Sequence, residues 1–341
     1  MRRLAIAEAL REAIAEEMRR DERVFCIGED IGVEGGFGGA FTVTLRLEKE
    51  FGHERIIDTP ISEIGICGTA IGAAINGMRP IADVQYSDFL FCMMDQLVNQ
   101  AAKFCFMSGG SVKVPIVMRA PVGATTRGCQ HAQSPESYFI HVPGLKIACP
   151  SNAYDAKGIL KSAVRDDNPV LIFEHKLLYG SKGIRSEKSA LSPTSEIPEE
   201  EYLVPLGKAK LKREGSDVTI LANLLMVYRA LEAAEKLEAE GISVEVIDPI
   251  SLVPFDFETL IRSLEKTNRL IIVHEDTLRG GWGAEVSATI TEKFFDTLDA
   301  PIIRVAAPDT PVPFAPIMEN FYVPNTERII KAVHKIVGWG K

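Results

Sequence analysis

The chain has 341 residues, of which 46% are hydrophobic and 25% are charged, with a formal net charge of −9 at neutral pH. This length and balance are typical of a folded protein with two domains, each with its own core. The acidic charge and the lack of a long basic run argue against a nucleic-acid-binding function, which requires clustered Lys and Arg.

The start of the chain predicts an amphipathic helix rather than a signal peptide. Ile6, Leu10, Ile14 and Met18 recur at four-residue spacing, and charges fall on every turn. The longest apolar stretch, residues 89–107, is broken by polar and charged residues, so we expect no membrane span. The six cysteines form no C-x-x-C pair and most lie in apolar runs, so we expect reduced core thiols in a cytoplasmic protein.

Short β-branched runs alternate with helical or loop segments in the first half of the chain. The runs cover residues 23–30, 55–60, 79–86, 114–121, 145–150 and 169–175. This alternation predicts a parallel sheet covered on both faces, in a first domain at residues 1–180.

A second series of strands and helices follows a polar stretch. Residues 181–204 are rich in Ser and Pro and have no apolar period, which predicts a linker. After it, runs such as DVTILAN, SVEVIDP and RLIIVHED alternate with helical patterns. We therefore expect a smaller α/β domain at residues 205–341.

Several common catalytic and nucleotide-binding motifs are missing. Walker A, G-x-G-x-x-G and G-x-S-x-G do not occur, which argues against a Rossmann dinucleotide site and an α/β-hydrolase. Gly68 and Gly72 instead indicate a helix packed tightly on its sheet. A thiol nucleophile at Cys129 beside His131 is an alternative, but no third positioning group can be named for it.

Glu63 is the most informative acidic residue of the first domain. It follows Ser62 at the start of an apolar helix in which the next charge is Arg79. Helix capping is one interpretation of a carboxylate at this place. The alternative is a functional group, because a carboxylate that opens a buried helix needs a partner or a shifted pKa.

Two further segments add candidates. Tyr86, Phe89 and Phe91 follow a strand end, where parallel sheets hold ligands, and a flat ring beside a carboxylate suits a nitrogen heterocycle. Core packing is the simpler interpretation of these aromatics. His131 lies in a polar loop at residues 123–139, where it is either surface decoration or a group for proton transfer.

The order of these motifs resembles a known family over nearly the whole chain. GED at 28–30, DTPISEIGICGTAIGAAINGMRP at 58–80, HAQSPESYF at 131–139 and IDPISLVPFD at 247–256 are similar to the beta subunits of thiamin-diphosphate-dependent 2-oxo acid dehydrogenases. This family includes the pyruvate, branched-chain and acetoin complexes. The resemblance implies an α/β fold with a parallel-sheet, pyrimidine-type thiamin-diphosphate-binding domain, followed by a transketolase C-terminal-like domain.

The resemblance also implies roles for single residues. Glu63 would hydrogen-bond the aminopyrimidine ring of thiamin diphosphate and so assist proton removal from the cofactor. Phe89 would stack on that ring and Gln85 would line its pocket. Glu29 resembles a family glutamate near the cofactor, with a plain strand-end carboxylate as the alternative.

His131 corresponds to a family histidine that faces the reacting intermediate and assists acyl transfer to a lipoyl arm. The family commonly has His-Ser-Gln, whereas this chain has Ala132 after the histidine, so a hydroxyl contact is lost.

The resemblance further implies a monovalent-cation site, for K⁺, formed largely by backbone oxygens. Its candidate residues are Ile116, Ala163, Asp166 and Asn168.

The chain contains no Gly-Asp-Gly, the family motif that holds the diphosphate through a divalent ion. We therefore expect Mg²⁺ ligands on an alpha subunit, in an α2β2 heterotetramer that delivers acyl groups to a lipoyl acyltransferase core. The expected substrate is a 2-oxo acid, either pyruvate or a branched-chain one. An acetoin dehydrogenase subunit, a split transketolase-type subunit acting on a sugar phosphate and a non-catalytic scaffold are the alternatives.

Overall fold

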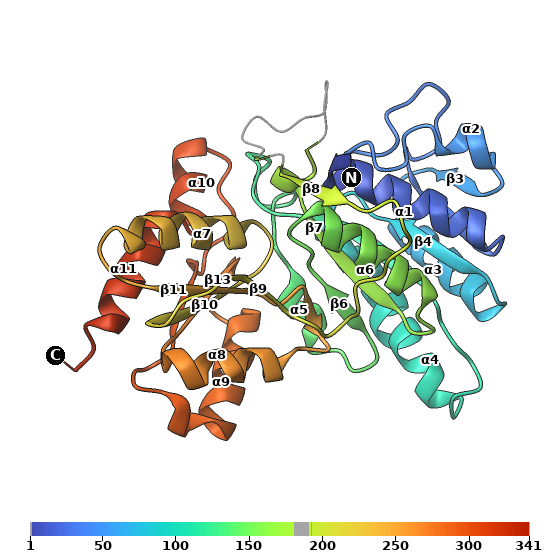
Figure 1. Ribbon diagram of the computed structural model, residues 1–341. Helices are drawn as coiled ribbons and strands as arrows, with labels where there is room; N and C mark the ends of the chain where they lie inside the picture. The colour runs from blue at the N-terminus through green and yellow to red at the C-terminus, as the bar shows by residue number, and fades with distance from the viewer. Residues whose placement is uncertain (1, 181–190, 192, 341) are drawn as a thin grey trace.

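The computed structural model describes residues 2–180, 191 and 193–340. The two main sheets lie side by side, each covered by helices, with the first half of the chain around the seven-stranded sheet and the second half around the five-stranded one (Figure 1). The residues of the expected linker at 181–190 and 192 lie outside the described residues.

The larger sheet has seven strands in the spatial order β12-β6-β7-β5-β4-β2-β3. Its strands are β2 (Val24–Glu29), β3 (Ile56–Thr59), β4 (Arg79–Asp83), β5 (Val117–Val122), β6 (Lys146–Ala148), β7 (Val170–His175) and β12 (Ser251–Val253). All pairs are parallel except β12 with β6. The edge strand β12 comes from the second half of the chain, so the two halves share this sheet.

Alternating side chains divide the larger sheet into two packed faces. Cys26 and Ile81 pack with α1 (Ile6–Arg20) and α6 (Ala153–Arg165), whereas Phe25 and Ile27 pack with α3 (Glu63–Ile75). The same side as α3 carries the 3₁₀ segment η1 (Ser87–Met93), the π-helical segment η2 (Asp95–Ala101) and α4 (Ala102–Met107). Short segments complete this half: α2 (Leu47–Phe51), α5 (Glu136–Ile140) and η3 (Lys176–Leu178).

The smaller sheet has the order β14-β13-β10-β11-β9. Its strands are β9 (Lys210–Arg213), β10 (Val218–Ala222), β11 (Val244–Asp248), β13 (Leu270–Thr277) and β14 (Ile303–Ala307). On one face lie α7 (Leu225–Glu238) and α11 (Thr326–Val337), and on the other α8 (Phe257–Thr267) and α9 (Trp282–Lys293) (Figure 1). The remaining helical segments are η4 (Phe295–Thr297) and α10 (Pro316–Tyr322).

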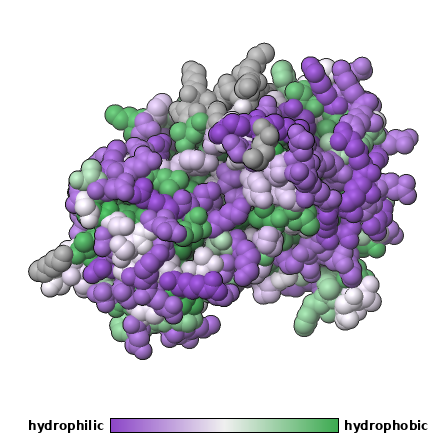
Figure 2. Space-filling model, in the orientation of Figure 1, coloured by the Kyte–Doolittle hydropathy of each residue, from purple (hydrophilic) through white to green (hydrophobic). Residues whose placement is uncertain are grey.

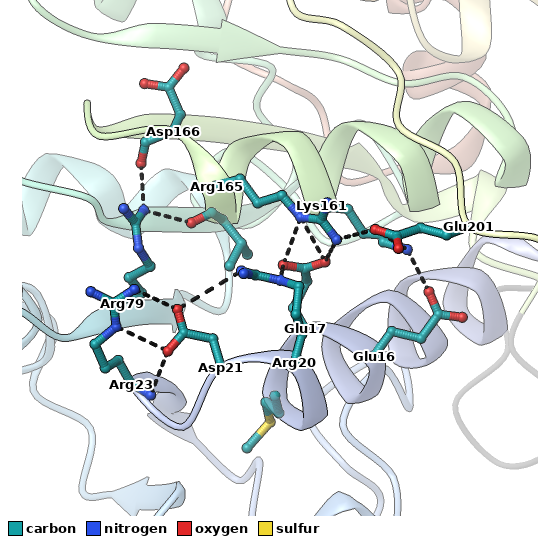
Figure 3. Close-up of polar contacts among 12 residues, drawn as sticks. Glu16, Glu17, Arg20, Asp21, Arg23, Arg79, Lys161, Arg165, Asp166 and Glu201 are labelled. Carbon is teal, nitrogen blue, oxygen red and sulfur yellow. Dashed lines mark hydrogen bonds and ion pairs between the residues drawn. The ribbon is translucent and has the colours of Figure 1, made fainter.

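Polar contacts fasten α1 to α6. Glu17 on α1 is fully buried and lies between Arg20 and Arg165, whose guanidinium groups both donate to its carboxylate (Figure 3). Lys161 of α6 is also buried and pairs with Glu16 at 2.8 Å. In the space-filling view, hydrophilic residues cover most of the side where α1 lies (Figure 2).

The amphipathic helix predicted at the N-terminus begins only at Ile6. The residues before it form β1 (Arg2–Ala5), which pairs antiparallel with β8 (Thr194–Ile197). The periodicity therefore located the apolar face of α1 but not its start, because the partner strand lies about 190 residues away in the sequence.

The structure also bears on the expectations about the cysteines and about a membrane span. The cysteines are free thiols, and three of them, Cys26, Cys67 and Cys149, are buried, whereas Cys92 and Cys129 are exposed. Among the described residues, no helix combines the length and apolar character needed to cross a bilayer.

Candidate active site at the carboxyl edge of the larger sheet

The predicted cofactor residues lie at one edge of the larger sheet. β2 ends at Glu29, β3 ends four residues before Glu63, and β4 ends two residues before Gln85. The loop that carries His131 leaves the end of β5. Because these strands are parallel neighbours, their carboxyl ends meet at the edge where open α/β sheets bind ligands.

Glu63 is the first residue of α3 and is half-buried. The residue at the N-cap is Ser62, and its side chain makes no capping hydrogen bond. Within the described part of the chain, the Glu63 carboxylate has no hydrogen bond or ion pair. It is therefore available to a group from outside the chain, and the structure gives no support to a capping role.

Glu29 and Gln85 lie together beside Glu63. The Gln85 side-chain amide donates to the backbone carbonyl of Glu29 at 2.9 Å. Burial raises the pKa of the Glu29 carboxyl above its ordinary value, and the charges of Asp30 and Glu63 add to the rise. The charge of Glu63 therefore favours the protonated form of Glu29.

Phe89 and His131, which are 42 residues apart, contact each other through their rings. Their centroids are 5.2 Å apart with an interplanar angle of 81°, an edge-to-face arrangement. The Tyr86 ring also meets the His131 ring edge to face, with centroids 6.1 Å apart and an interplanar angle of 76°. Both Phe89 and His131 are half-buried, so the imidazole is held by aromatic neighbours while remaining within reach of a ligand.

Lys176 is a residue of this edge that sequence reasoning missed. Its ammonium group is buried, donates to the carbonyl of His131 at 2.5 Å and to that of Gly123 at 3.1 Å, and lies 4.6 Å from the Tyr86 ring centroid. The only sequence signal was a lysine directly after an apolar strand. Lys176 fixes the backbone of the loop rather than the imidazole itself.

Ala132 occupies the position where the family commonly has serine. Its side chain is 1% exposed and lies in a small apolar cluster with Ala124, Ala307, Val312 and Tyr322. An unpaired hydroxyl would be costly in these surroundings, which accounts for alanine here.

The residues of the predicted cation site lie near the opposite edge of the sheet. Ile116 directly precedes β5, and Asp166 and Asn168 lie four and two residues before β7. The Asp166 carboxylate accepts a side-chain hydrogen bond from Asn168 at 2.8 Å, and the Ala163 carbonyl accepts from the backbone of Asp166. Arg79 donates to the Asp166 carbonyl at 3.0 Å, so one of the predicted cation ligands already accepts a hydrogen bond from a guanidinium group (Figure 3).

A metal site formed by side chains is not seen among the described residues. They contain no group of three or more His, Cys, Asp and Glu side chains that could hold a metal ion.

Comparison with known proteins connects this edge to a family. The model of the transketolase pyrimidine-binding domain matches residues 2–182, and that of the transketolase C-terminal domain matches residues 207–329. The acetoin:2,6-dichlorophenolindophenol oxidoreductase subunit beta of Bacillus subtilis is 45% identical, over 98% of this chain and 97% of that protein. The 2-oxoisovalerate dehydrogenase subunit beta of the same organism is 44% identical, over 98% of both chains.

The mitochondrial pyruvate dehydrogenase E1 component subunit beta of Caenorhabditis elegans is 42% identical, over 97% of this chain and 92% of that protein. This chain belongs to the E1 beta family of 2-oxo acid dehydrogenases. A solved structure entitled split gene transketolase, inactive beta4 tetramer, has the same overall fold, with a TM-score of 0.76 and coverage of 99% of both chains. At 23% sequence identity, that likeness concerns the fold alone.

Membership in the E1 beta family confirms the resemblance and the fold class predicted from the motifs. It also makes the chain part of a thiamin-diphosphate-dependent, transketolase-like group. The roles of Glu29, Glu63, Gln85, Phe89 and His131 remain predictions, which the geometry of the edge makes testable.

Proposed function

We propose that the chain is the beta subunit of an E1 component that decarboxylates a 2-oxo acid and passes the acyl group to lipoamide. The observation that carries the proposal is the carboxylate of Glu63 at the carboxyl edge of the sheet, which has no partner among the described residues and lies near the Phe89 and His131 rings. Relatives at 44% and 42% identity, named as beta subunits of 2-oxoisovalerate and pyruvate dehydrogenases, support the reaction class.

The residues at the edge fit one half of thiamin diphosphate. When bound, the cofactor supplies the nucleophile for the substrate carbonyl and the electron sink for loss of CO₂. Glu63 would hold a proton between its carboxylate and a ring nitrogen, while Phe89 would offer its face to the ring. Gln85 would line the pocket, and His131 would move a proton as the lipoyl disulfide is reductively acylated, with one sulfur taking the acyl group and the other leaving as a thiol.

The other half of the cofactor requires a partner. Since the sequence lacks Gly-Asp-Gly, the diphosphate and its Mg²⁺ would be held by an alpha subunit, in an α2β2 assembly. The outward side of α3, together with Ile61 just before it, supports such an interface. Ile61 and Ile64 are 74% and 57% exposed, and a Cβ added at Gly68 or Gly72 would meet no atom within 4 Å. K⁺ at the Asp166 site is part of the same proposal.

The first experiment tests Glu63 in the reconstituted complex. We expect Glu63→Gln to lower lipoamide-dependent turnover by about 100-fold or more, because an amide cannot take up the proton. The measurements are turnover and thiamin diphosphate affinity, with assembly checked by size. Glu54→Gln changes an exposed carboxylate before β3 and serves as the matched control. Wild-type turnover in Glu63→Gln would reject the proposal.

The substrate and the partner are tested together. Relatives of the acetoin, oxoisovalerate and pyruvate types are 45%, 44% and 42% identical, so the panel contains acetoin, branched-chain 2-oxo acids and pyruvate. Sugar phosphates are included for the transketolase-type alternative. Preparations free of the alpha chain should show no turnover. A chain that binds cofactor with its partner but accelerates no reaction would be the non-catalytic scaffold.

A further inference from the structure

The loop that carries His131 is held by residues of both halves of the chain. On its own side, Lys176 binds the carbonyls of Gly123 and His131. On the other side, two carboxylates of the second half bind backbone N–H groups. The second half therefore contacts the loop directly, although it contributes none of the predicted catalytic residues.

The two carboxylates come from different elements of the second half. Glu275 of β13 accepts from the backbone N–H of Ala124 at 2.6 Å, and Glu319 of α10 accepts from that of Thr126 at 2.6 Å. Each glutamate is 7% exposed. Hydrogen bonds from N–H groups to buried carboxylates are stronger than those between neutral groups, so the two contacts fix the loop in register.

His175 completes the contact of Glu275. Its Nδ1 accepts from the backbone N–H of Leu177 at 3.2 Å, so its proton lies on Nε2, which donates to Glu275 at 2.8 Å. Burial alone would raise the pKa of Glu275, but His175 and the Ala124 N–H outweigh it and hold the pKa below its ordinary value. Glu275 is thus an ionised acceptor for two donors at once.

The loop backbone is unusual at the points where it is held. Gly123 has φ +98°, and a Cβ there would lie 2.2 Å from Nε2 of His175, so only glycine fits. Thr126 has φ +58°, a conformation that is rare for a β-branched residue. The bond to Glu319 is formed at this residue. The surrounding contacts, rather than local preference, hold the loop in this shape.

We propose that Glu275 and Glu319, from the second half of the chain, are positioning residues. They hold the loop so that His131 is correctly placed for acyl transfer. The inference rests on the proposed function, since it assumes that His131 takes part in acylating lipoamide. It adds a role for the second half of the chain, whereas the predicted catalytic residues of this chain all lie in the first half.

The variants are chosen by the number of acceptors they retain. Glu275→Gln keeps one acceptor oxygen and cannot serve both Ala124 and His175. Glu319→Ala loses its acceptor, whereas Glu319→Gln keeps one for Thr126 and should restore most of the activity. Glu265→Gln on α8 changes an exposed carboxylate away from the loop and is the control.

Two activities of the complex with the alpha subunit are compared. Lipoamide acylation needs His131, whereas decarboxylation coupled to a dye acceptor such as 2,6-dichlorophenolindophenol bypasses acyl transfer. We expect Glu275→Gln and Glu319→Ala to lower the kcat of lipoamide acylation about tenfold or more, because a small displacement of a catalytic group is costly. Dye-coupled decarboxylation should stay within about twofold of wild type.

Two further measurements separate positioning from simple instability. In a His131→Ala background, Glu275→Gln should cause no further loss, because both changes affect one group. Amide hydrogen exchange in residues 123–131 of the complex should be faster in both variants. Equal loss of both activities, multiplicative loss in the double variant or unchanged exchange would overturn the inference. Wild-type complex with dye-coupled turnover but no lipoamide acylation would instead reject the proposed function, while hydrogen exchange would still test the contact.

Discussion

Arg119 shows how a single buried charge organises the interior beneath the site. It lies in β5, makes two hydrogen bonds to Glu174 at 2.9 and 2.5 Å, and also pairs with Asp83. Tyr179 donates to the same glutamate at 2.5 Å. Burial alone would lower the pKa of Arg119, but the two carboxylates outweigh it and hold the pKa above its ordinary value. Three neighbouring strands, β4, β5 and β7, are thereby linked by charge.

Removing Arg119 tests this linkage. We expect Arg119→Met to lower the free energy of unfolding by about 3–5 kcal/mol, because it leaves two buried carboxylates without a counter-charge. Arg262→Met is the control, since Arg262 and its partner Glu258 are 69% and 61% exposed and such pairs contribute about 1 kcal/mol or less. Urea unfolding of both variants provides the measurement. Equal losses would contradict a structural role for the buried cation.

At the scale of elements, α3 has two different faces. Ile66, Cys67, Ala70, Ile71 and Ala74 are buried against the sheet. The opposite face carries Gly68 and Gly72, so the prediction that these glycines pack the helix against its own sheet is wrong. The helix is apolar on both faces, and composition alone did not reveal which one meets the sheet. An apolar face without a side-chain obstacle suits close approach of a partner.

Substitutions of Gly68 can test folding and assembly separately. Since a Cβ at this position meets nothing, Gly68→Ala should stabilise the isolated chain by up to about 1 kcal/mol through helix propensity. Gly68→Leu should also fold, yet reduce binding of the alpha subunit. Thermal unfolding of the isolated chain and size analysis of the complex measure the two effects. Glu235→Leu adds a leucine to the exposed side of α7 as a control. Normal assembly of Gly68→Leu would exclude this face from the interface.

The elements that sequence predicts best are those decided by their own residues. Buried parallel strands such as Val170–His175 are continuous apolar runs, and the start of α3 at Glu63 was correctly located. The short strands β1, β8, β9 and β12 were missed, because their formation depends on a distant partner. The same limit applies to the site. The motif order led to Glu63 and His131, but Glu275 and Glu319 bind a loop about 150 and 190 residues away.

At the scale of the molecule, buried acidic groups gather where the two halves meet. Glu136 begins α5 of the first half and is 2% exposed, and one of its oxygens has no hydrogen-bond partner among the described residues. Burial, with the charges of Asp276 and Glu275 from β13 added, raises the pKa of Glu136 to about 8. The protonated form therefore fits the folded chain at neutral pH, and its deprotonation opposes the contact between the halves.

This boundary should make stability depend on pH in a defined direction. The pKa of Glu136 rises from an ordinary 4.5 to about 8 in the folded chain, so between these values the folded chain holds a proton that the unfolded chain releases. The free energy of unfolding therefore falls as pH rises, by up to about 1.4 kcal/mol per pH unit. Glu136→Gln, which keeps the shape and cannot ionise, should flatten this part of the profile and be more stable than wild type near pH 8. The measurement is the urea midpoint of wild type and of Glu136→Gln from pH 5.5 to 8. Other groups that titrate in this range, such as Asp83, are present in both proteins and contribute equally to the two profiles. Parallel profiles would mean that Glu136 is already ionised in the folded protein and that the two halves accommodate its charge.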